Sequence, residues 1–266
     1  MKGRMQRLLR TAALLCMAAV LLCGTASANS APPDYLLAVK VVNGPEEPYE
    51  LKLLPPAGMD DSNFYMNQDT ENENENEDGT YLFSHPFMSD QFRILISTKS
   101  GDTWTSDVLE RRVVQDAVRV DWATKKVSMP PIWLAVVLQT ISTLLPTLAV
   151  EGWLLLVFRF EWKRNWKPFL LVNLATQGAL ALFLSIKIVQ CGAYYVTAFF
   201  GAIVLIPIEV VIAIVEARQY RRRLQGRPED VAFAYGLTAN AASYLLGVWA
   251  VPLAWTYLAR VLWMGA

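Results

Sequence analysis

The sequence predicts an all-β extracytoplasmic domain followed by an all-α four-helix transmembrane bundle. Hydrophobic residues make up 54% of the 266 residues, which is more than a water-soluble core of this size requires. Short β-branched and aromatic segments occur before Pro130, and long apolar stretches follow it. The charge is also divided, with nine basic and eighteen acidic residues in 29–130 but eleven basic and six acidic residues in 131–266.

Residues 1–28 have the layout of a secretory signal peptide. Basic residues precede an apolar run from Thr11 to Cys23, and Ala26-Ser27-Ala28 is a small-residue cleavage sequence. The apolar run is too short to cross a bilayer comfortably. We therefore expect cleavage after Ala28. A lipoprotein modified at Cys23 and an uncleaved anchor are the alternatives.

Residues 29–129 are expected to form the extracytoplasmic β domain. Short segments rich in β-branched and aromatic residues alternate there with turn-forming Gly, Pro and Asn. These predicted strands are 35–42, 49–54, 92–98, 103–109 and 116–122. Such spacing over about a hundred residues is typical of an immunoglobulin-like or fibronectin-III-like sandwich. The alternation in 117–121 predicts a strand with one solvent-exposed face.

A low-complexity acidic segment, 66–80, interrupts the predicted β domain. From Gln68 to Gly79 it has no apolar residue, and its like charges repel one another, so we expect a disordered loop. Its spacing does not match an EF-hand loop with a central glycine and a terminal bidentate glutamate. The single histidine, His85, has no second histidine with which to share a metal. We therefore predict no metal site and no cofactor.

Residues 130–266 are expected to cross the membrane four times. Four apolar stretches are long enough for about 30 Å of hydrocarbon, and they are 132–158, 168–187, 195–217 and 232–259. Basic residues fill the first and third connections, whereas the second, at 188–194, has none. Because positively charged loops stay in the cytoplasm, residues 29–129 and the C-terminus should lie outside a plasma membrane. This topology accounts for the basic residues, so nucleic-acid binding is not expected.

Polar side chains occur at similar depths in these predicted spans. Glu151 and Glu209 stand about 12–14 Å inside the basic connections at 1.5 Å per helical residue. Ionisable groups are costly inside a bilayer, so they mark functional sites. We therefore hypothesise a ligand or ion site in which the two glutamates meet. Its residues would be Glu151, Glu209, Asn173, Gln177 and Asn240.

Helical spacing predicts where the other polar residues of these spans face. Gln139, Thr143, Thr147 and Glu151 recur every four residues, so we expect one polar face directed into the bundle. Glu216 precedes the basic Arg218 by two residues and is expected at the membrane interface.

Three pieces of the chain, Glu151–Phe158, Leu171–Gly178 and Glu209–Tyr220, resemble uncharacterised four-span envelope membrane proteins of Gram-positive bacteria. The resemblance covers roughly residues 131–250. It implies a bacterial plasma-membrane location and no particular chemistry.

Three functions stay open from the sequence. The leading hypothesis is a non-enzymatic envelope protein whose outer domain binds a protein or envelope ligand and whose helices hold a cation, a proton or a small polar group. The second is a transporter or channel subunit for a cation or small polar solute, as a homo-oligomer because four helices enclose little volume. The third is an intramembrane carboxylate enzyme. Soluble-enzyme chemistry is disfavoured, since no phosphate-binding glycine loop or paired-histidine zinc helix is present.

Overall fold

The computed structural model describes residues 36–58, 79–84, 89–193 and 206–265. The predicted signal peptide, residues 66–78 of the acidic loop and residues 195–205 of the third predicted span lie outside the described residues. The described chain divides into two compact units. We call 36–139, 185–193 and 255–265 the β unit, and 140–184 and 206–254 the helical unit.

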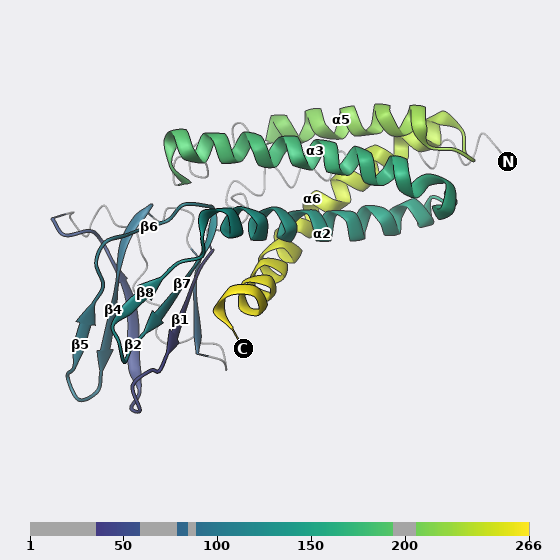
Figure 1. The fold of residues 1–266 in the computed structure, drawn as a ribbon. Coiled ribbons are helices and arrows are strands. Elements are labelled where there is room, and N and C mark those ends of the chain that lie inside the picture. Colours follow the sequence, from purple (N-terminus) through teal and green to yellow (C-terminus); the bar gives the residue numbers. More distant parts are fainter. Residues whose placement is uncertain (1–35, 59–78, 85–88, 194–205, 266) are drawn as a thin grey trace. The chain divides into compact units, whose positions relative to one another are not determined.

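The strands of the β unit form two sheets (Figure 1). In the first, the order is β3 (Thr80–Ser84), β1 (Leu36–Val42), β7 (Gln115–Asp121) and β8 (Lys126–Ser128). In the second, the order is β2 (Tyr49–Leu54), β4 (Gln91–Thr98) and β5 (Thr103–Thr105), and β6 (Leu109–Glu110) also pairs with β4. β1 and β7 run parallel, with Leu36 opposite Gln115, whereas the other pairs are antiparallel.

Four predicted strands are confirmed to within one residue at each end, as β1, β2, β4 and β7. The predicted strand 103–109 is instead two short strands, β5 and β6. β3 and β8 were not predicted, and the acidic loop was predicted one residue too long, since β3 begins at the fully buried Thr80. β1 lies between β3 and β7, whereas the first strand of an immunoglobulin constant-type sheet lies at an edge.

The core of the β unit lies between the two sheets. Alternate side chains of each strand point into it, as the two-residue period of a strand requires. Its buried members are Leu37, Val39, Val41, Leu51, Leu53, Tyr81, Phe92, Ile94, Ile96, Val118 and Val120. Burial of each large side chain of this kind stabilises the fold by about 1.5–3 kcal/mol.

A second apolar cluster covers the other face of the first sheet. Its strand residues pack against Leu138 of α2 (Ile132–Val157), against the end of α6 (Glu229–Ala259) and against a short π-helix (Arg260–Met264). The buried members are Leu36, Ala38, Ala117, Leu138, Trp255, Ala259 and Met264. The predicted exposed face of 117–121 is therefore covered at Ala117, although Arg119 is exposed.

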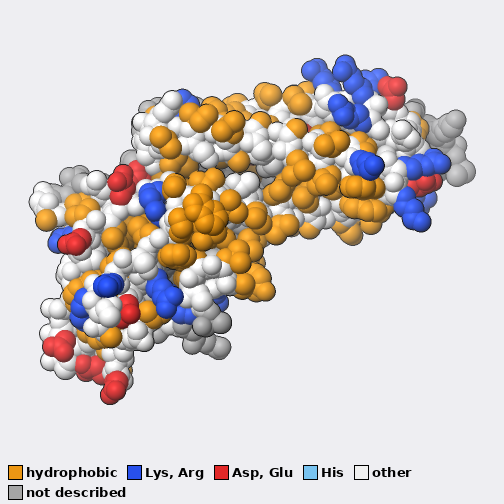
Figure 2. All heavy atoms as spheres, viewed as in Figure 1, with side chains coloured by type: hydrophobic (Ala, Val, Ile, Leu, Met, Phe, Trp, Pro, Cys, Tyr) orange, Lys and Arg blue, Asp and Glu red, His pale blue; other side chains and the backbone are white. Residues whose placement is uncertain are grey.

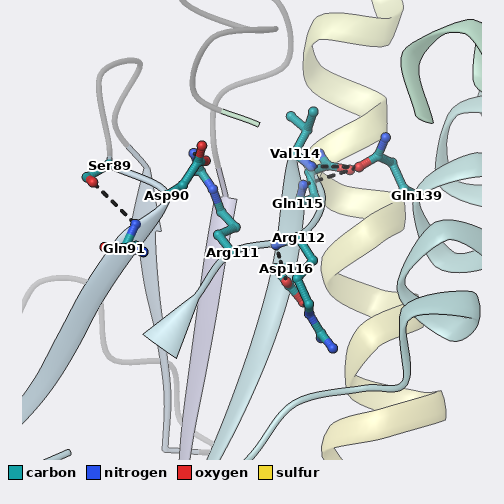
Figure 3. Close-up of polar contacts among 9 residues, drawn as sticks. All are labelled: Ser89, Asp90, Gln91, Arg111, Arg112, Val114, Gln115, Asp116 and Gln139. Carbon is teal, nitrogen blue, oxygen red and sulfur yellow. Dashed lines mark hydrogen bonds and ion pairs between the residues drawn. The ribbon is translucent and has the colours of Figure 1, made fainter. Parts of the chain in front are cut away.

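Gln139 connects α2 with the start of β7 (Figure 3). Its Oε1 accepts hydrogen bonds from the backbone N–H groups of Val114, at 2.9 Å, and Gln115, at 3.4 Å. Gln139 therefore bonds to the β unit. The four-residue spacing had predicted that it continues the polar face of Glu151, and the structure differs from this prediction.

A buried carboxylate lies in the same region. Burial raises the pKa of Asp116, while the neighbouring Arg112 guanidinium, 3.7 Å away, opposes this shift.

Replacing Gln139 with leucine should destabilise the β unit by about 1–3 kcal/mol, because two backbone N–H groups lose their acceptor. The measurement is thermal unfolding of the full chain in detergent, followed by tryptophan fluorescence. Gln139→Glu is the matched control, since it keeps an oxygen at the same place and should melt close to the wild type. Equal melting of Gln139→Leu and the wild type would contradict this role.

The helices after the β strands are α2, α3 (Trp162–Cys191), α5 (Ile206–Arg223) and α6. By length and composition α2 and α3 are able to cross a membrane. Glu229–Gly247 and Trp249–Met264 add a third candidate if this bent pair counts as one span. The described residues thus show two or three such helices and not the four that were predicted. The difference arises partly at α5, since the first half of its predicted span lies outside the described residues.

Candidate functional site

A buried group of polar side chains lies inside the helical unit, where α2, α3, α5 and α6 each contribute at least one member. We call this group the polar centre. Its members are Glu151 of α2, Asn173 and Thr176 of α3, Glu216 and Tyr220 of α5, and Asn240 and Ser243 of α6. α3 and α5 lie side by side along this region (Figure 1).

Glu151 accepts hydrogen bonds from three helices. Its side chain is only 1% exposed. Asn173 Nδ2 donates to one carboxylate oxygen at 3.1 Å, and Ser243 Oγ donates to the other at 3.2 Å. The Tyr220 hydroxyl also bonds to this carboxylate. The backbone carbonyl of Glu151 accepts from the Tyr235 hydroxyl at 3.1 Å, so both the side chain and the main chain of this residue are held.

Glu216 is the second carboxylate of the polar centre, and it is fully buried. Asn240 Nδ2 donates to one of its oxygens at 2.8 Å, and Thr176 bonds to the other. Glu216 also lies near enough to Glu151 for the two carboxylates to repel each other. Among the described residues neither glutamate forms an ion pair with a basic side chain.

Asn173 connects the parts of the polar centre. Its Nδ2 donates to the Tyr220 hydroxyl at 2.8 Å as well as to Glu151, and also lies 3.2 Å from the backbone carbonyl of Phe169. Its Oδ1 is buried and has no hydrogen-bond partner within the part of the chain that the structure describes. A buried acceptor without a donor costs about 1–3 kcal/mol, so the polar centre has room for one further hydrogen-bond donor or positive group at this oxygen.

Close packing of α5 on α6 brings Asn240 to Glu216. A Cβ added at Gly236 would lie 2.5 Å from the Cα of Ala217, so no larger residue fits there without separating the helices. Asn240 follows one helical turn later and also donates to the carbonyl of Gly236 at 3.0 Å. The small residue therefore sets the helix spacing that the hydrogen bond to Glu216 needs.

An apolar and aromatic layer adjoins the polar centre within the helical unit. Tyr220 and Tyr235 are both fully buried, and their ring centroids are 5.2 Å apart. They belong to a cluster with Leu154, Leu155, Phe160, Phe169, Val172, Leu224, Ala232 and Ala239. Both hydroxyls point to Glu151 atoms, so the tyrosines contribute to the core with their rings and to the polar centre with their oxygens.

The structure brings together three of the five predicted site residues, namely Glu151, Asn173 and Asn240. Glu209 and Gln177 are half-buried, and their membership of the site stays a prediction. The second carboxylate that the structure places in the polar centre is Glu216. Glu216 was expected at the membrane interface and is instead fully buried.

A sequence signal for Glu216 was present. Glu209 and Glu216 are seven residues apart, which places them on one face of a helix. Tyr220 follows four residues after Glu216 on that same face. The proximity of Arg218 obscured this pattern, because Arg218 is exposed and takes no part in the polar centre.

The polar centre consists of oxygen acceptors and neutral donors. Among the described residues no group of three or more His, Cys, Asp or Glu side chains is placed to hold a metal ion. Two carboxylates without a basic partner are able to hold a proton or a cation.

Comparisons with protein-family models, with curated proteins and with solved structures gave no match for this chain.

Proposed function

We propose that the protein is a non-enzymatic, multi-pass protein of a bacterial plasma membrane. Its β unit is an extracytoplasmic module that binds a protein or envelope ligand, and its helical unit holds a proton or cation at the polar centre. The observation that carries this proposal is the burial of Glu151 and Glu216, together with their amide and hydroxyl donors, inside long apolar helices.

The surface of these helices supports a membrane environment. Large apolar side chains are exposed on them, including Trp153, which is 63% exposed, and Trp249, which is 76% exposed. Figure 2 shows hydrophobic side chains spread over the helices. Exposed apolar surface around a buried polar interior is stabilised by lipid and would be unfavourable in water.

The basic connections support the orientation. Nine exposed Lys and Arg side chains lie at one end of the helical unit (Figure 2), and they are Arg159, Lys163, Arg164, Lys167, Arg218, Arg221, Arg222, Arg223 and Arg227. Asn165 holds the two connections together, since its Oδ1 accepts from Gln225 N at 2.8 Å and its Nδ2 donates to Gln225 O at 3.1 Å. A single basic end of this kind favours the cytoplasmic side.

Reporter fusions test the proposed topology. A dual reporter fused after Gln225 should give cytoplasmic activity only, because the surrounding basic side chains resist translocation. The same reporter fused after Gly265 is the matched control and should give exported activity only. Exported activity at Gln225 would overturn the proposed orientation, and cytoplasmic activity at both positions would overturn the proposed number of crossings.

A cation or proton carrier is the second candidate function. It is favoured by the two buried carboxylates that have no basic partner among the described residues. Flux into proteoliposomes that depends on Glu151 and Glu216 would support the carrier, whereas the binding protein proposed first shows none.

A further inference from the structure

We propose that Glu151 and Glu216 together bind one hard monovalent cation, of the Na⁺ or Li⁺ class, and that a proton shared between them takes its place when no such cation is bound. This inference deepens the proposed function and rests on it only in placing the helical unit in a membrane.

The charge of the polar centre requires a positive partner. Glu151 is 1% exposed and Glu216 is 0% exposed. Two carboxylates that repel each other in a medium of low dielectric do not both stay ionised without a compensating charge. The basic side chains at the connections are exposed and form no ion pair with either glutamate within the described ranges. One proton or one cation therefore has to reside at the pair.

The donors around the pair are suited to one remaining negative charge. Asn173, Tyr220 and Ser243 donate to Glu151, and Thr176 and Asn240 bond to Glu216. All five are neutral, so they solvate a carboxylate without cancelling its charge. Ser243 and Thr176 each have a single hydroxyl proton and also lie within hydrogen-bonding distance of a helix carbonyl. Each of these hydroxyl protons is therefore shared between a glutamate and a carbonyl, so the carboxylate oxygens are able to bind a further positive group.

The unpartnered oxygen of Asn173 is a second observation in the same group of side chains, and it agrees with a missing positive partner. The Asn173 side chain is fully buried, its Nδ2 is held by Glu151 and Tyr220, and its Oδ1 has no donor among the described residues. A proton or a cation bound by the carboxylates would give this oxygen a partner. The carboxylate, amide and hydroxyl oxygens available here are ligands for hard cations.

The charge balance favours a monovalent cation over a divalent one. With two carboxylates, a bound proton and a bound monovalent cation leave the same net charge, so they exchange without changing the charge that the five donors stabilise. Ca²⁺ takes six to eight oxygen ligands and Mg²⁺ keeps several waters. Each of the four carboxylate oxygens already bonds to one protein donor, which leaves too few free oxygens for the six to eight ligands of a divalent cation such as Ca²⁺, and no third carboxylate joins them among the described residues.

Other titratable groups near the pair lie on α5 and α6. Glu209 is two helical turns from Glu216 on α5, and the Tyr220 and Tyr235 hydroxyls adjoin Glu151. α2 contributes Glu151 itself, and α3 contributes Asn173 and Thr176, which do not titrate. Glu209 is therefore the group to control in any experiment that reports on protonated carboxyls.

Labelling of the purified full chain with dicyclohexylcarbodiimide tests the proposal, because this hydrophobic reagent modifies protonated carboxyl groups. In choline chloride at neutral pH we expect an adduct on Glu151 or Glu216, located by tandem mass spectrometry. Na⁺ or Li⁺ at ten times its Kd should lower the labelling rate about tenfold. Ca²⁺ and Mg²⁺ at the same concentration should not protect.

Glutamine variants distinguish cation binding at the Glu151–Glu216 pair from binding at the nearby Glu209. Protection by Na⁺ or Li⁺ should disappear in Glu151→Gln and in Glu216→Gln, and it should persist in Glu209→Gln, the matched control. The same cations should raise the melting temperature of the wild type and of Glu209→Gln only. The wild-type labelling is decisive even if a glutamine variant fails to fold.

Three results would overturn the proposal. They are no adduct on either glutamate between pH 5 and pH 9, an adduct that no monovalent cation suppresses, and protection by a divalent cation alone. Labelling in detergent does not depend on membrane orientation. If reporter fusions contradict the topology while Na⁺ or Li⁺ protects, the proposed function fails and the cation site stands.

Discussion

Gly236→Ala should destabilise the helical unit by about 3 kcal/mol, at the upper end of the usual cost of overpacking. The new methyl group would lie 2.5 Å from the Cα of Ala217, which is a backbone atom and does not rotate away. α5 and α6 must separate, and the 2.8 Å hydrogen bond from Asn240 to Glu216 lies one turn beyond the contact. The measurement is thermal unfolding of the full chain in detergent.

Gly178→Ala is the matched control for this substitution. Gly178 also lies within a helix, but a Cβ there meets no atom within 4 Å. The control should be neutral or stabilising by about 0.5–1 kcal/mol, because alanine is the better helix former. The close approach of α5 and α6 would be contradicted if the two variants changed the melting temperature equally. Weakened Na⁺ or Li⁺ protection in Gly236→Ala would connect the helix contact to the polar centre.

Asn173→Leu should destabilise the helical unit by about 2–4 kcal/mol, since a buried charged group that loses its donor costs more than a neutral one. The substitution removes the donor to Glu151 at 3.1 Å and to the Tyr220 hydroxyl at 2.8 Å. Leucine is similar in size, so the loss reports on hydrogen bonding rather than on a cavity. Thermal unfolding in detergent again provides the measurement.

Gln177→Leu makes the same chemical change one turn further along α3, at a half-buried side chain. It should alter the melting temperature by less than Asn173→Leu does. Adding Glu151→Gln to Asn173→Leu should recover part of the loss, because an uncharged side chain tolerates a missing donor better. Equal losses in Asn173→Leu and Gln177→Leu, or no recovery in the double variant, would show that Asn173 does not support Glu151.

Local sequence patterns were sufficient for the longest strands and for the helical type of the long apolar stretches, although α3 begins six residues before its predicted span. β1, β2, β4 and β7 are apolar and β-branched over six to eight residues, and their predicted bounds were close. β8 has three residues, too few for a periodic pattern. β3 follows an acidic stretch directly, and its strand structure depends on pairing with β1 from forty residues earlier in the chain.

The polar centre was predicted in part. Glu151, Asn173 and Asn240 were recognisable because polar side chains in long apolar stretches are rare. Glu216 was not among the predicted site residues, because depth along a helix was taken to decide which residues meet. The close packing of α5 on α6 at Ala217 and Gly236 lies beside the hydrogen bond from Asn240 to Glu216, and the sequence pattern does not contain that contact.

The sequence by itself determined that an acidic β part precedes long apolar helices and that rare buried polar residues interrupt those helices, because composition and periodicity are local properties of the chain. Only the tertiary structure decided that Glu216 joins Glu151 in the polar centre, that Gln139 bonds to the start of β7, and that the first sheet is covered on both faces. These outcomes depend on which surfaces of distant segments pack together. Such packing is a property of the whole fold, so no single segment predicts it.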